Sequence, residues 1–276
     1  MNTPAVVRLA GLQGFLLDMD GTVYQGPEPL YGAADFIAYL RETCRKFLFL
    51  TNNPTADRQG YVRKLSGMGI HVEPDTILTS GEATVAYLLS ETSWRRVYAL
   101  GTPSFEAELR QAGIDPQSDQ PEAVILSFDK TLTYAKLERA CLLLRKGLPY
   151  VATNPDKVCP TEYGYIPDCG SMAALLAEAT GGRWPRFIGK PSPDFARMAL
   201  RRLECSADAA AMVGDRLYTD IAMARHSDIT GILVLSGETS QADLLSAAEQ
   251  PDLVFNSVAE LHEALRAADL TRKSSV

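Results

Sequence analysis

Short apolar runs alternate with longer amphipathic stretches along most of this chain, and this alternation limits the fold more than any other feature. Residues 15–17 and 47–50 are apolar runs bounded by turn residues, as expected of buried strands. Between them, the spacing of Phe36 and Leu40 places apolar side chains on one face of a helix. A strand, a helix and a strand in this order are typical of a parallel sheet with right-handed crossovers.

The same pattern continues through the rest of the chain. Further strands are predicted at residues 96–100, 123–127, 150–153, 186–189, 209–213, 229–235 and 253–255. Helices are predicted between them, and Thr55 is expected to cap a helix that starts at residue 56. Residues 154–170, which contain three prolines, are predicted to be irregular. The sequence therefore predicts a doubly wound α/β fold with a Rossmann-like parallel-sheet core, and the surplus of strands indicates a second α/β module.

Polar residues follow four of the predicted strands at the point where each strand ends. These residues are Asp18 and Asp20 after the first strand, Thr51, Asn52 and Asn53 after the second, Lys190 after residues 186–189, and Asp215 and Asp220 after residues 209–213. Ligands of parallel sheets bind beyond the carboxyl ends of the strands. Each cluster by itself could be a surface turn, but four clusters in the same structural position favour one shared site.

The side chains in these clusters suit one kind of chemistry. Asp18 and Asp20 alternate along an extended segment, so both carboxylates can point to the same side. Buried carboxylates need a cation, a proton or a catalytic reason, because isolated buried charge is costly. Asp18 and Asp215 supply the hard oxygen ligands that suit Mg²⁺. Thr51 offers a hydroxyl group near backbone amides, and Lys190 offers a compact positive charge, both of which suit a phosphate group.

In order and strand context, the four clusters resemble the motifs of the haloacid dehalogenase superfamily of phosphatases, which are DxD, then Thr or Ser, then Lys, then GDxxxxD. This resemblance implies that Asp18 is the nucleophile that forms an aspartyl phosphate. It also implies that Asp20 protonates the leaving group and then activates water.

The same resemblance assigns roles to the other residues. It implies four phosphate-binding residues, which are Thr51, Asn52, Asn53 and Lys190. It implies that Mg²⁺ is held by Asp18, by the main-chain carbonyl of Asp20 and by Asp215. Asp220 would support these ligands indirectly.

Further segments resemble the NagD and 4-nitrophenylphosphatase branch of this superfamily, among them DGTVYQGPEPLYGA, FLFLTNNPT, ATNPDKVCPTE and VGDRLYTDI. This branch inserts an α/β cap between the second and third motifs. The resemblance implies a discontinuous catalytic core at residues 1–79 and 184–276, and a substrate-selecting cap at residues 80–183. Related pyridoxal phosphate phosphatases have a His where this chain has Cys159, which argues against that substrate.

The resulting expectation is a Mg²⁺-dependent phosphomonoester hydrolase that acts through an aspartyl phosphate. By resemblance, its substrates are small phosphorylated metabolites such as nucleoside monophosphates, sugar phosphates or glycerol phosphates, with 4-nitrophenyl phosphate as a substrate in vitro. One alternative is a phosphotransferase, which would use the same residues with water excluded. The other is a phospho-aspartate signalling module. Asp20 argues against this second alternative, because receiver domains lack a second acid two residues after the nucleophile.

Composition limits the partners and the compartment. The formal net charge of −7 among 276 residues argues against nonspecific binding of nucleic acid. The five cysteines include no CxxC pair, so neither a disulfide framework nor a zinc site is expected. No apolar run has the length of a secretory signal or a membrane helix. The expectation is a cytoplasmic protein that binds neither nucleic acid nor membrane, with a homo-oligomer left open.

Overall fold

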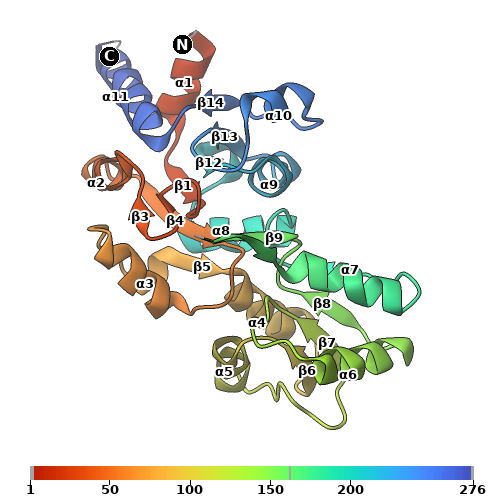
Figure 1. Ribbon diagram of the computed structural model, residues 1–276. Helices are drawn as coiled ribbons and strands as arrows, with labels where there is room; N and C mark the ends of the chain where they lie inside the picture. Colours follow the sequence, from red (N-terminus) through yellow and green to blue (C-terminus); the bar gives the residue numbers. More distant parts are fainter. Residues whose placement is uncertain (1–2, 162, 275–276) are drawn as a thin grey trace. The chain divides into compact units, whose positions relative to one another are not determined.

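The computed structural model describes residues 3–161 and 163–274. The chain forms two compact units (Figure 1). The first unit comprises Met1–Leu50, Val62–Ile77 and Ala196–Val276, and the second comprises Thr51–Tyr61 and Leu78–Phe195. The predicted division into a catalytic core and a substrate-selecting cap concerns function, and it stays a prediction.

A six-stranded sheet lies mostly in the first unit (Figure 1), with the strand order β14-β13-β12-β1-β4-β5. In that order the strands span Leu253–Phe255, Thr230–Val234, Ala210–Gly214, Gly14–Leu17, Lys46–Thr51 and Ile77–Thr79. β1 pairs in parallel with both β12 and β4, and all four of its residues are buried. A strand that is buried on both sides is typical of a parallel sheet with both faces covered. The predicted doubly wound α/β fold is therefore confirmed.

Seven helices of the described residues lie wholly or partly in the first unit. Their bounds are α1 Thr3–Gly11, α2 Ala33–Glu42, α3 Arg58–Gly67, α8 Pro193–Leu203, α9 Ala222–His226, α10 Gln241–Ser246 and α11 Val258–Ser274. Among them, α11 contacts α1 and α2, while α9 contacts β12 and β13. The ring of Phe15 in β1 meets the ring of Phe36 in α2 edge to face, with centroids 5.8 Å apart. The predicted apolar face of α2 therefore packs against the sheet. A short hairpin of β2 (Tyr24–Gln25) and β3 (Glu28–Pro29) follows β1.

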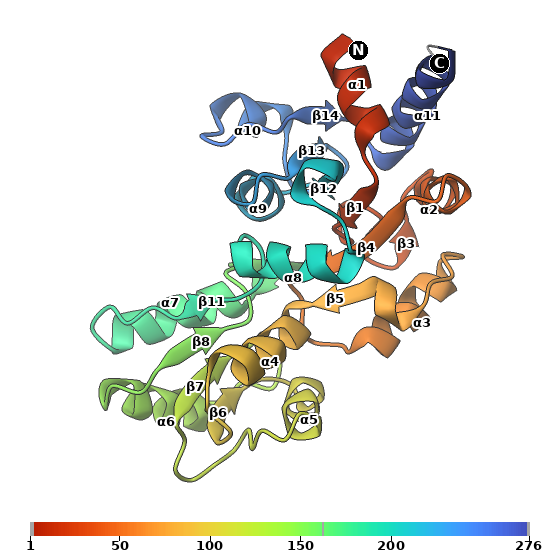
Figure 2. The ribbon, with the colours of Figure 1, turned by 180° about the vertical axis from the view of Figure 1, so that it is seen from behind.

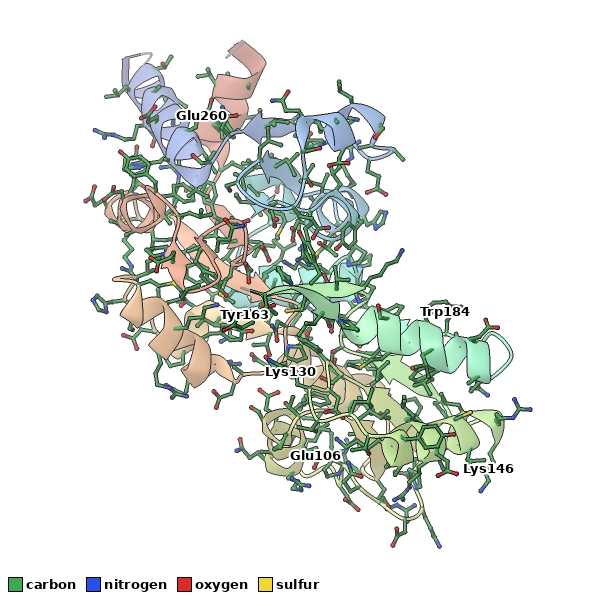
Figure 3. The ribbon with its side chains drawn as sticks, in the orientation of Figure 1. Glu106, Lys130, Lys146, Tyr163, Trp184 and Glu260 are labelled. Atoms are coloured by element: carbon green, nitrogen blue, oxygen red, sulfur yellow. The ribbon has the colours of Figure 1, made fainter. Side chains whose placement is uncertain are left out.

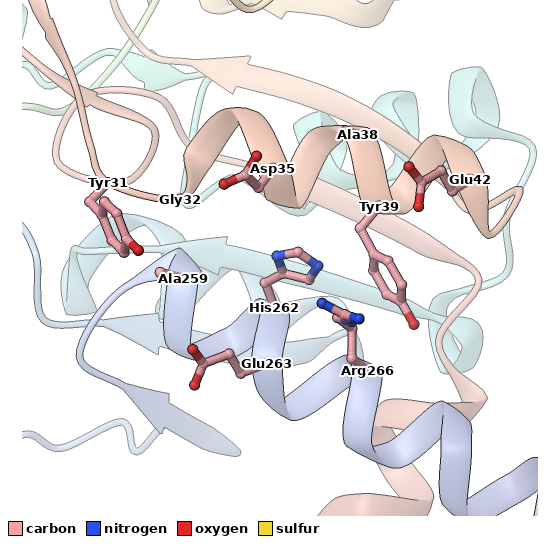
Figure 4. Close-up of a pocket in the computed structure, with 10 residues that line it drawn as sticks. All are labelled: Tyr31, Gly32, Asp35, Ala38, Tyr39, Glu42, Ala259, His262, Glu263 and Arg266. Carbon is pink, nitrogen blue, oxygen red and sulfur yellow. The ribbon is translucent and has the colours of Figure 1, made fainter.

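A groove of about 430 Å³ lies between α2 and α11 (Figure 4). The rings of Tyr39 and His262 lie side by side along it, with centroids 4.8 Å apart. The hydroxyl of Tyr39 donates a hydrogen bond of 2.6 Å to Asp269, and burial together with this bond raises the pKa of Tyr39 to about 12. No residue of the predicted site lines this groove.

The second unit is built on a four-stranded parallel sheet with the order β11-β8-β7-β6. In that order the strands span Arg186–Phe187, Tyr150–Ala152, Ala123–Leu126 and Val97–Leu100. One face of this sheet forms a core with α6 (Tyr134–Arg145) and α7 (Cys169–Ala179). Two further helices, α4 (Ser80–Glu91) and α5 (Pro103–Gln111), contact each other in the same unit (Figure 2). This sheet is the second α/β module that the surplus of predicted strands indicated.

The prediction that residues 154–170 are irregular is wrong for two segments. β9 (Val158–Thr161) and β10 (Gly164–Pro167) form an antiparallel hairpin, and the side chain of Tyr163 is exposed in its turn (Figure 3). The sequence pattern did not predict this hairpin, because both of its strands contain proline and central strands exclude proline. An isolated two-stranded ribbon tolerates proline, since each strand has one unpaired edge.

The prediction that Thr55 caps the next helix is also wrong. The hydroxyl of Thr55 donates to the Asn53 side chain at 2.6 Å. The helix α3 begins at Arg58, and the carboxylate of Asp57 accepts a hydrogen bond of 2.8 Å from the amide of Gly60. Asp57 therefore satisfies an amide of the first helical turn, as residues before a helix commonly do.

A half-buried carboxyl group in α5 makes the stability of the second unit depend on pH. Burial raises the pKa of Glu108 to about 7, with a smaller effect from the negative charge of Asp57. The folded state therefore holds this proton more tightly than the unfolded state. Its contribution to stability is complete below pH 4.5 and is lost as the pH rises through about 7.

We expect Glu108→Gln to raise the free energy of unfolding at pH 8 by about 1–2 kcal/mol, because the neutral amide avoids the cost of a buried charge. This value is smaller than the full pKa shift implies, since the side chain is partly exposed. Urea unfolding at pH 5 and pH 8 measures the effect, and the gain should nearly vanish at pH 5. The exposed Glu91 in α4 provides the control Glu91→Gln. An equal gain at both pH values would contradict the prediction.

Candidate active site

The two carboxylates that follow β1 and β12 lie at the same end of the first sheet. Leu17 is paired with Val213, so the residues after these two positions leave the sheet at one edge. The amide of Asp18 continues the ladder by donating to the carbonyl of Val213 at 2.8 Å. Asp18 is only 9% exposed and Asp215 only 2%. The strand register therefore brings together the residues that the sequence predicted from strand ends.

Asp220 joins this pair. One carboxylate oxygen from each of Asp18, Asp215 and Asp220 lies within 4.8 Å of the other two. Asp220 belongs to a π-helical turn, Leu217–Ile221, and its carboxylate fits against the chain because residue 214 is a glycine. A Cβ atom at Gly214 would lie 2.3 Å from the carboxyl carbon of Asp220. These three residues are called the acidic cluster below.

The acidic cluster has the properties of a cation site. Burial raises the pKa of Asp215 well above its ordinary value, and the charges of Asp18 and Asp220 raise it further. The Oδ1 atom of Asp215 is buried and accepts no hydrogen bond from any described residue. The Oδ2 atom accepts one from the amide of Glu238 at 2.6 Å. A divalent cation would pair with the orphaned oxygen and offset the mutual repulsion, and the all-oxygen donor set fits Mg²⁺.

Asp20 lies beyond the end of β1, in a turn built on the carbonyl of Met19. This carbonyl accepts hydrogen bonds from the amides of Val23 at 2.8 Å and Tyr24 at 3.1 Å. Burial raises the pKa of Asp20, and the positive charge of Lys64 acts in the opposite direction. A carboxyl group with a raised pKa holds its proton closer to neutral pH, as a general acid must.

The other predicted residues lie in the second unit and form a second group. Thr51 and Asn52 are nearly buried, and Lys190 is 2% exposed. The hydroxyl of Thr51 accepts a hydrogen bond of 3.1 Å from the amide of Asn53. The side chain of Asn53 accepts from both the amide and the hydroxyl of Thr55. The side chain of Asn52 contacts the main chain of Lys190, so the structure brings these two predicted residues together.

A loop after β13 contacts Asp215 of the acidic cluster, and this loop is not among the four predicted clusters. The side chain of Ser236 donates to the carbonyl of Gly21 at 2.7 Å, and the amide of Thr239 donates to the carbonyl of Asp215 at 3.2 Å. The signal was present in the sequence, because residues 236–239 (SGET) follow a predicted strand in the same way as the four clusters.

Comparison with known proteins identifies the family. A model described as haloacid dehalogenase-like hydrolase matches residues 15–115, and a second, HAD-hydrolase-like model matches residues 187–261. The acid sugar phosphatase of Staphylococcus haemolyticus is 36% identical over 247 residues, which are 89% of this chain and 94% of that protein. The chain belongs to the haloacid dehalogenase-like hydrolases. The predicted membership of the superfamily is confirmed, and this hydrolase is a phosphatase.

Solved structures of this family share the fold. The 4-nitrophenylphosphatase of Thermotoga maritima is 42% identical, with a TM-score of 0.90 over 94% of this chain and 99% of that chain. The glycerol phosphate phosphatase Rv1692 of Mycobacterium tuberculosis, in complex with magnesium, is 32% identical, with a TM-score of 0.86 over 94% of this chain and 79% of that chain. Structures described as NagD also match, which confirms the predicted branch. Within the described residues, this hydrolase has no helix that is long and apolar enough to cross a membrane.

The loop after β13 gives a prediction for this hydrolase. A Cβ atom at Gly237 would lie 2.0 Å from Oδ2 of Asp215, so Gly237→Ala must displace this carboxylate. We expect kcat to fall by about 10- to 100-fold, with a higher half-saturating concentration of Mg²⁺. The matched control is Gly67→Ala in α3, where an added Cβ meets no atom within 4 Å. An unchanged Mg²⁺ titration of Gly237→Ala would show that the loop does not position Asp215.

Proposed function

We propose that this phosphatase is a Mg²⁺-dependent phosphomonoester hydrolase that acts through an aspartyl phosphate on Asp18. The observation that carries the proposal is the acidic cluster, in which the buried Asp215 keeps one oxygen without a hydrogen-bond donor among the described residues. Three carboxylates this close are unfavourable without a cation. A phosphate ester is a substrate that requires such a cation, because its own negative charge must be offset.

The reaction needs two acids with different roles. A carboxylate oxygen of Asp18 attacks the phosphorus, which forms an acyl phosphate bond as the ester P–O bond breaks. Asp20 gives its proton to the departing alcohol oxygen. Water then attacks the phosphorus of the aspartyl phosphate while Asp20 takes back a proton, and inorganic phosphate leaves with Asp18 regenerated. The raised pKa of Asp20 supports the first of these proton transfers.

The metal ligands in this proposal are Asp18, the main-chain carbonyl of Asp20, and Asp215. Asp220 supports them, and its position within the acidic cluster agrees with this role. When bound, Mg²⁺ supplies positive charge that lowers the repulsion between the phosphate and the carboxylates. The magnesium complex of the related glycerol phosphate phosphatase supports the choice of ion.

The residues of the second group bind the transferred phosphoryl group in this proposal. Thr51 provides its hydroxyl, and Asn52 and Asn53 lie next to it in the same loop. Lys190 provides a positive charge for the phosphoryl oxygens and the nucleophile. Thr51 is the last residue of β4, Asn52 and Asn53 follow it, and Lys190 follows β11. Phosphate-binding residues of α/β folds lie at such strand ends.

The proposed substrates are small phosphorylated metabolites. Sugar phosphates are suggested by the name of the related acid sugar phosphatase, and 4-nitrophenyl phosphate by that of the related 4-nitrophenylphosphatase. Glycerol phosphates are suggested by the name of the related glycerol phosphate phosphatase. Nucleoside monophosphates belong in the same panel. Residues 80–183 would act as the cap that selects among them. A cytoplasmic location is also part of the proposal, and a homo-oligomer is left open.

The test is phosphate release from 4-nitrophenyl phosphate, first with excess Mg²⁺ and then with a chelator. We expect turnover that the chelator abolishes and that added Mg²⁺ restores. Turnover that is indifferent to the chelator would exclude the metal-dependent mechanism. Transfer of phosphate to an added alcohol in preference to water would favour the phosphotransferase alternative. A long-lived label on Asp18 without turnover would favour the signalling module.

A further inference from the structure

We propose that the side chain of Asn52 is a positioning residue for Lys190 and does not itself bind the substrate. This inference rests on the proposed function, in which Lys190 acts on the phosphoryl group. It differs from the expectation that Asn52 binds phosphate. It also gives residues of the loop after β8 a role in positioning Asn52.

The carboxamide of Asn52 pairs with the main chain of Lys190 through two hydrogen bonds. Its Oδ1 atom accepts from the amide of Lys190 at 2.8 Å, and its Nδ2 atom donates to the carbonyl of Lys190 at 3.0 Å. The two residues are 138 positions apart in the sequence. One side chain therefore fixes both polar groups of the Lys190 backbone, and it links the loop after β4 to the loop after β11.

The second donor of the same carboxamide is also occupied. Nδ2 of Asn52 donates to Oδ2 of Asp156 at 2.6 Å. A carboxamide has two N–H donors, so both are now paired within the protein. A substrate phosphate would need one of these donors, because its oxygens only accept hydrogen bonds. The side chain of Asn52 therefore has no donor left for a phosphate.

Asp156 is itself held in a buried network. It is 2% exposed, and the same Oδ2 atom accepts a second hydrogen bond of 3.0 Å from the side chain of Asn154. Asn154 also donates to Asp168 at 3.1 Å and accepts from the hydroxyl of Thr153 at 2.7 Å. Oδ2 of Asp156 only accepts hydrogen bonds. The Asn52 carboxamide must therefore point its Nδ2 atom, and not its Oδ1 atom, toward Asp156.

The surrounding chain packs closely against the Asn52 carboxamide. A Cβ atom at Gly189 would lie 2.5 Å from Oδ1 of Asn52 and 2.7 Å from the carbonyl of Thr153. The main chain of Asn52 is anchored as well, because the buried hydroxyl of Ser80 donates to its carbonyl at 2.7 Å. The position of the Lys190 backbone thus depends on Asn52, and the orientation of Asn52 depends on Asp156.

The first test separates positioning from substrate binding. We expect Asn52→Ala to lower kcat for 4-nitrophenyl phosphate by about 100-fold, the cost of misplacing a catalytic group by about 1 Å. KM should change by less than about threefold, since no ground-state contact to the phosphate is removed. The control is Asn256→Ala, which removes an exposed carboxamide that donates to Glu260. A rise in KM with kcat unchanged would overturn the proposal.

The second test asks whether Asn52 acts through Lys190. In the Lys190→Ala background, we expect Asn52→Ala to lower kcat by less than about threefold, because the group that it positions is already absent. A further loss of about 100-fold in this background would overturn the proposal. Wild-type kcat in Lys190→Ala alone would remove Lys190 from the reaction, and so would overturn the proposed function at this residue as well.

The third test changes Asp156 and leaves Asn52 intact, so its result does not depend on whether the Asn52 variants fold. Asp156→Asn keeps an oxygen that can accept from Asn52 and Asn154, so kcat should stay within about threefold of wild type. Asp156→Leu keeps a similar volume but accepts no hydrogen bond, so kcat should fall by about 30-fold or more at temperatures well below its melting point. Equal kcat values for the two variants would overturn the role of Asp156, and with it the fixed orientation of Asn52.

Discussion

Asp18→Asn is expected to abolish turnover, with kcat falling by at least about 10⁴-fold, while the protein stays folded. The loss is large because a carboxamide cannot form the acyl phosphate bond, and removal of a nucleophile costs more than removal of a binding group. The fold should tolerate the change, since Asn has nearly the same shape as Asp. The variant also removes one of the negative charges that raise the pKa of Asp215.

Phosphate release from 4-nitrophenyl phosphate measures the loss, and thermal unfolding in chelator measures the fold. The melting temperature of Asp18→Asn should equal or exceed that of the wild type, because the acidic cluster carries less charge. The control is Asp208→Asn, which changes an exposed carboxylate in the same unit and should leave kcat unaltered. Turnover of Asp18→Asn above about 1% of wild type would show that Asp18 is not the nucleophile.

Asp20→Asn should lower steady-state turnover by about 10²–10⁴-fold, and it should make the phosphoenzyme persist. An amide can neither give a proton to the leaving oxygen nor take one from water. The acid step matters less for 4-nitrophenol than for a sugar alcohol, since 4-nitrophenolate leaves without help. Dephosphorylation therefore becomes the slow step with 4-nitrophenyl phosphate.

A rapid-quench experiment distinguishes the two steps. We expect a burst of 4-nitrophenolate close to one equivalent per active site, followed by slow release of phosphate. Intact-mass measurement of the quenched protein should show one added phosphoryl group, which is absent in Asp18→Asn/Asp20→Asn. Phosphate release at the wild-type rate in Asp20→Asn would assign the acid–base role to another residue.

Local sequence pattern predicted the strand ends and therefore the residues of the acidic cluster. Asp18 and Asp215 each follow a short apolar run, and neighbouring parallel strands place such residues at one edge of the sheet. What the pattern cannot give is which side chains are paired within the protein. Asn52 contacts Asp156 and Lys190, which are 104 and 138 positions away in the sequence. Those contacts depend on tertiary packing, so the sequence alone predicted a phosphate-binding role for Asn52 and gave no sign of this pairing.

The same limit explains why the loop after β13 was not predicted to belong to the site. The carboxylate of Glu238 does not identify the Ser236–Thr239 segment as part of the site, because Glu238 contacts Asp215 through its amide and not through its side chain. A backbone contact of this kind leaves no trace in residue type. Glycines at positions 21 and 237 are the partial exception, since each makes room for the carboxylate of Asp215.

The crowding around this carboxylate has a consequence for protein engineering. A Cβ atom at Gly21 or at Gly237 would come within 2.4 Å of the same oxygen of Asp215. These two glycines come from segments more than 200 residues apart in the sequence. A side chain at either position would push the carboxylate of Asp215 away, even if the other position stayed glycine. Libraries that aim to change the substrate should therefore leave this edge of the sheet untouched. They should concentrate on the loop that carries Tyr163, whose exposed side chain meets no such restriction.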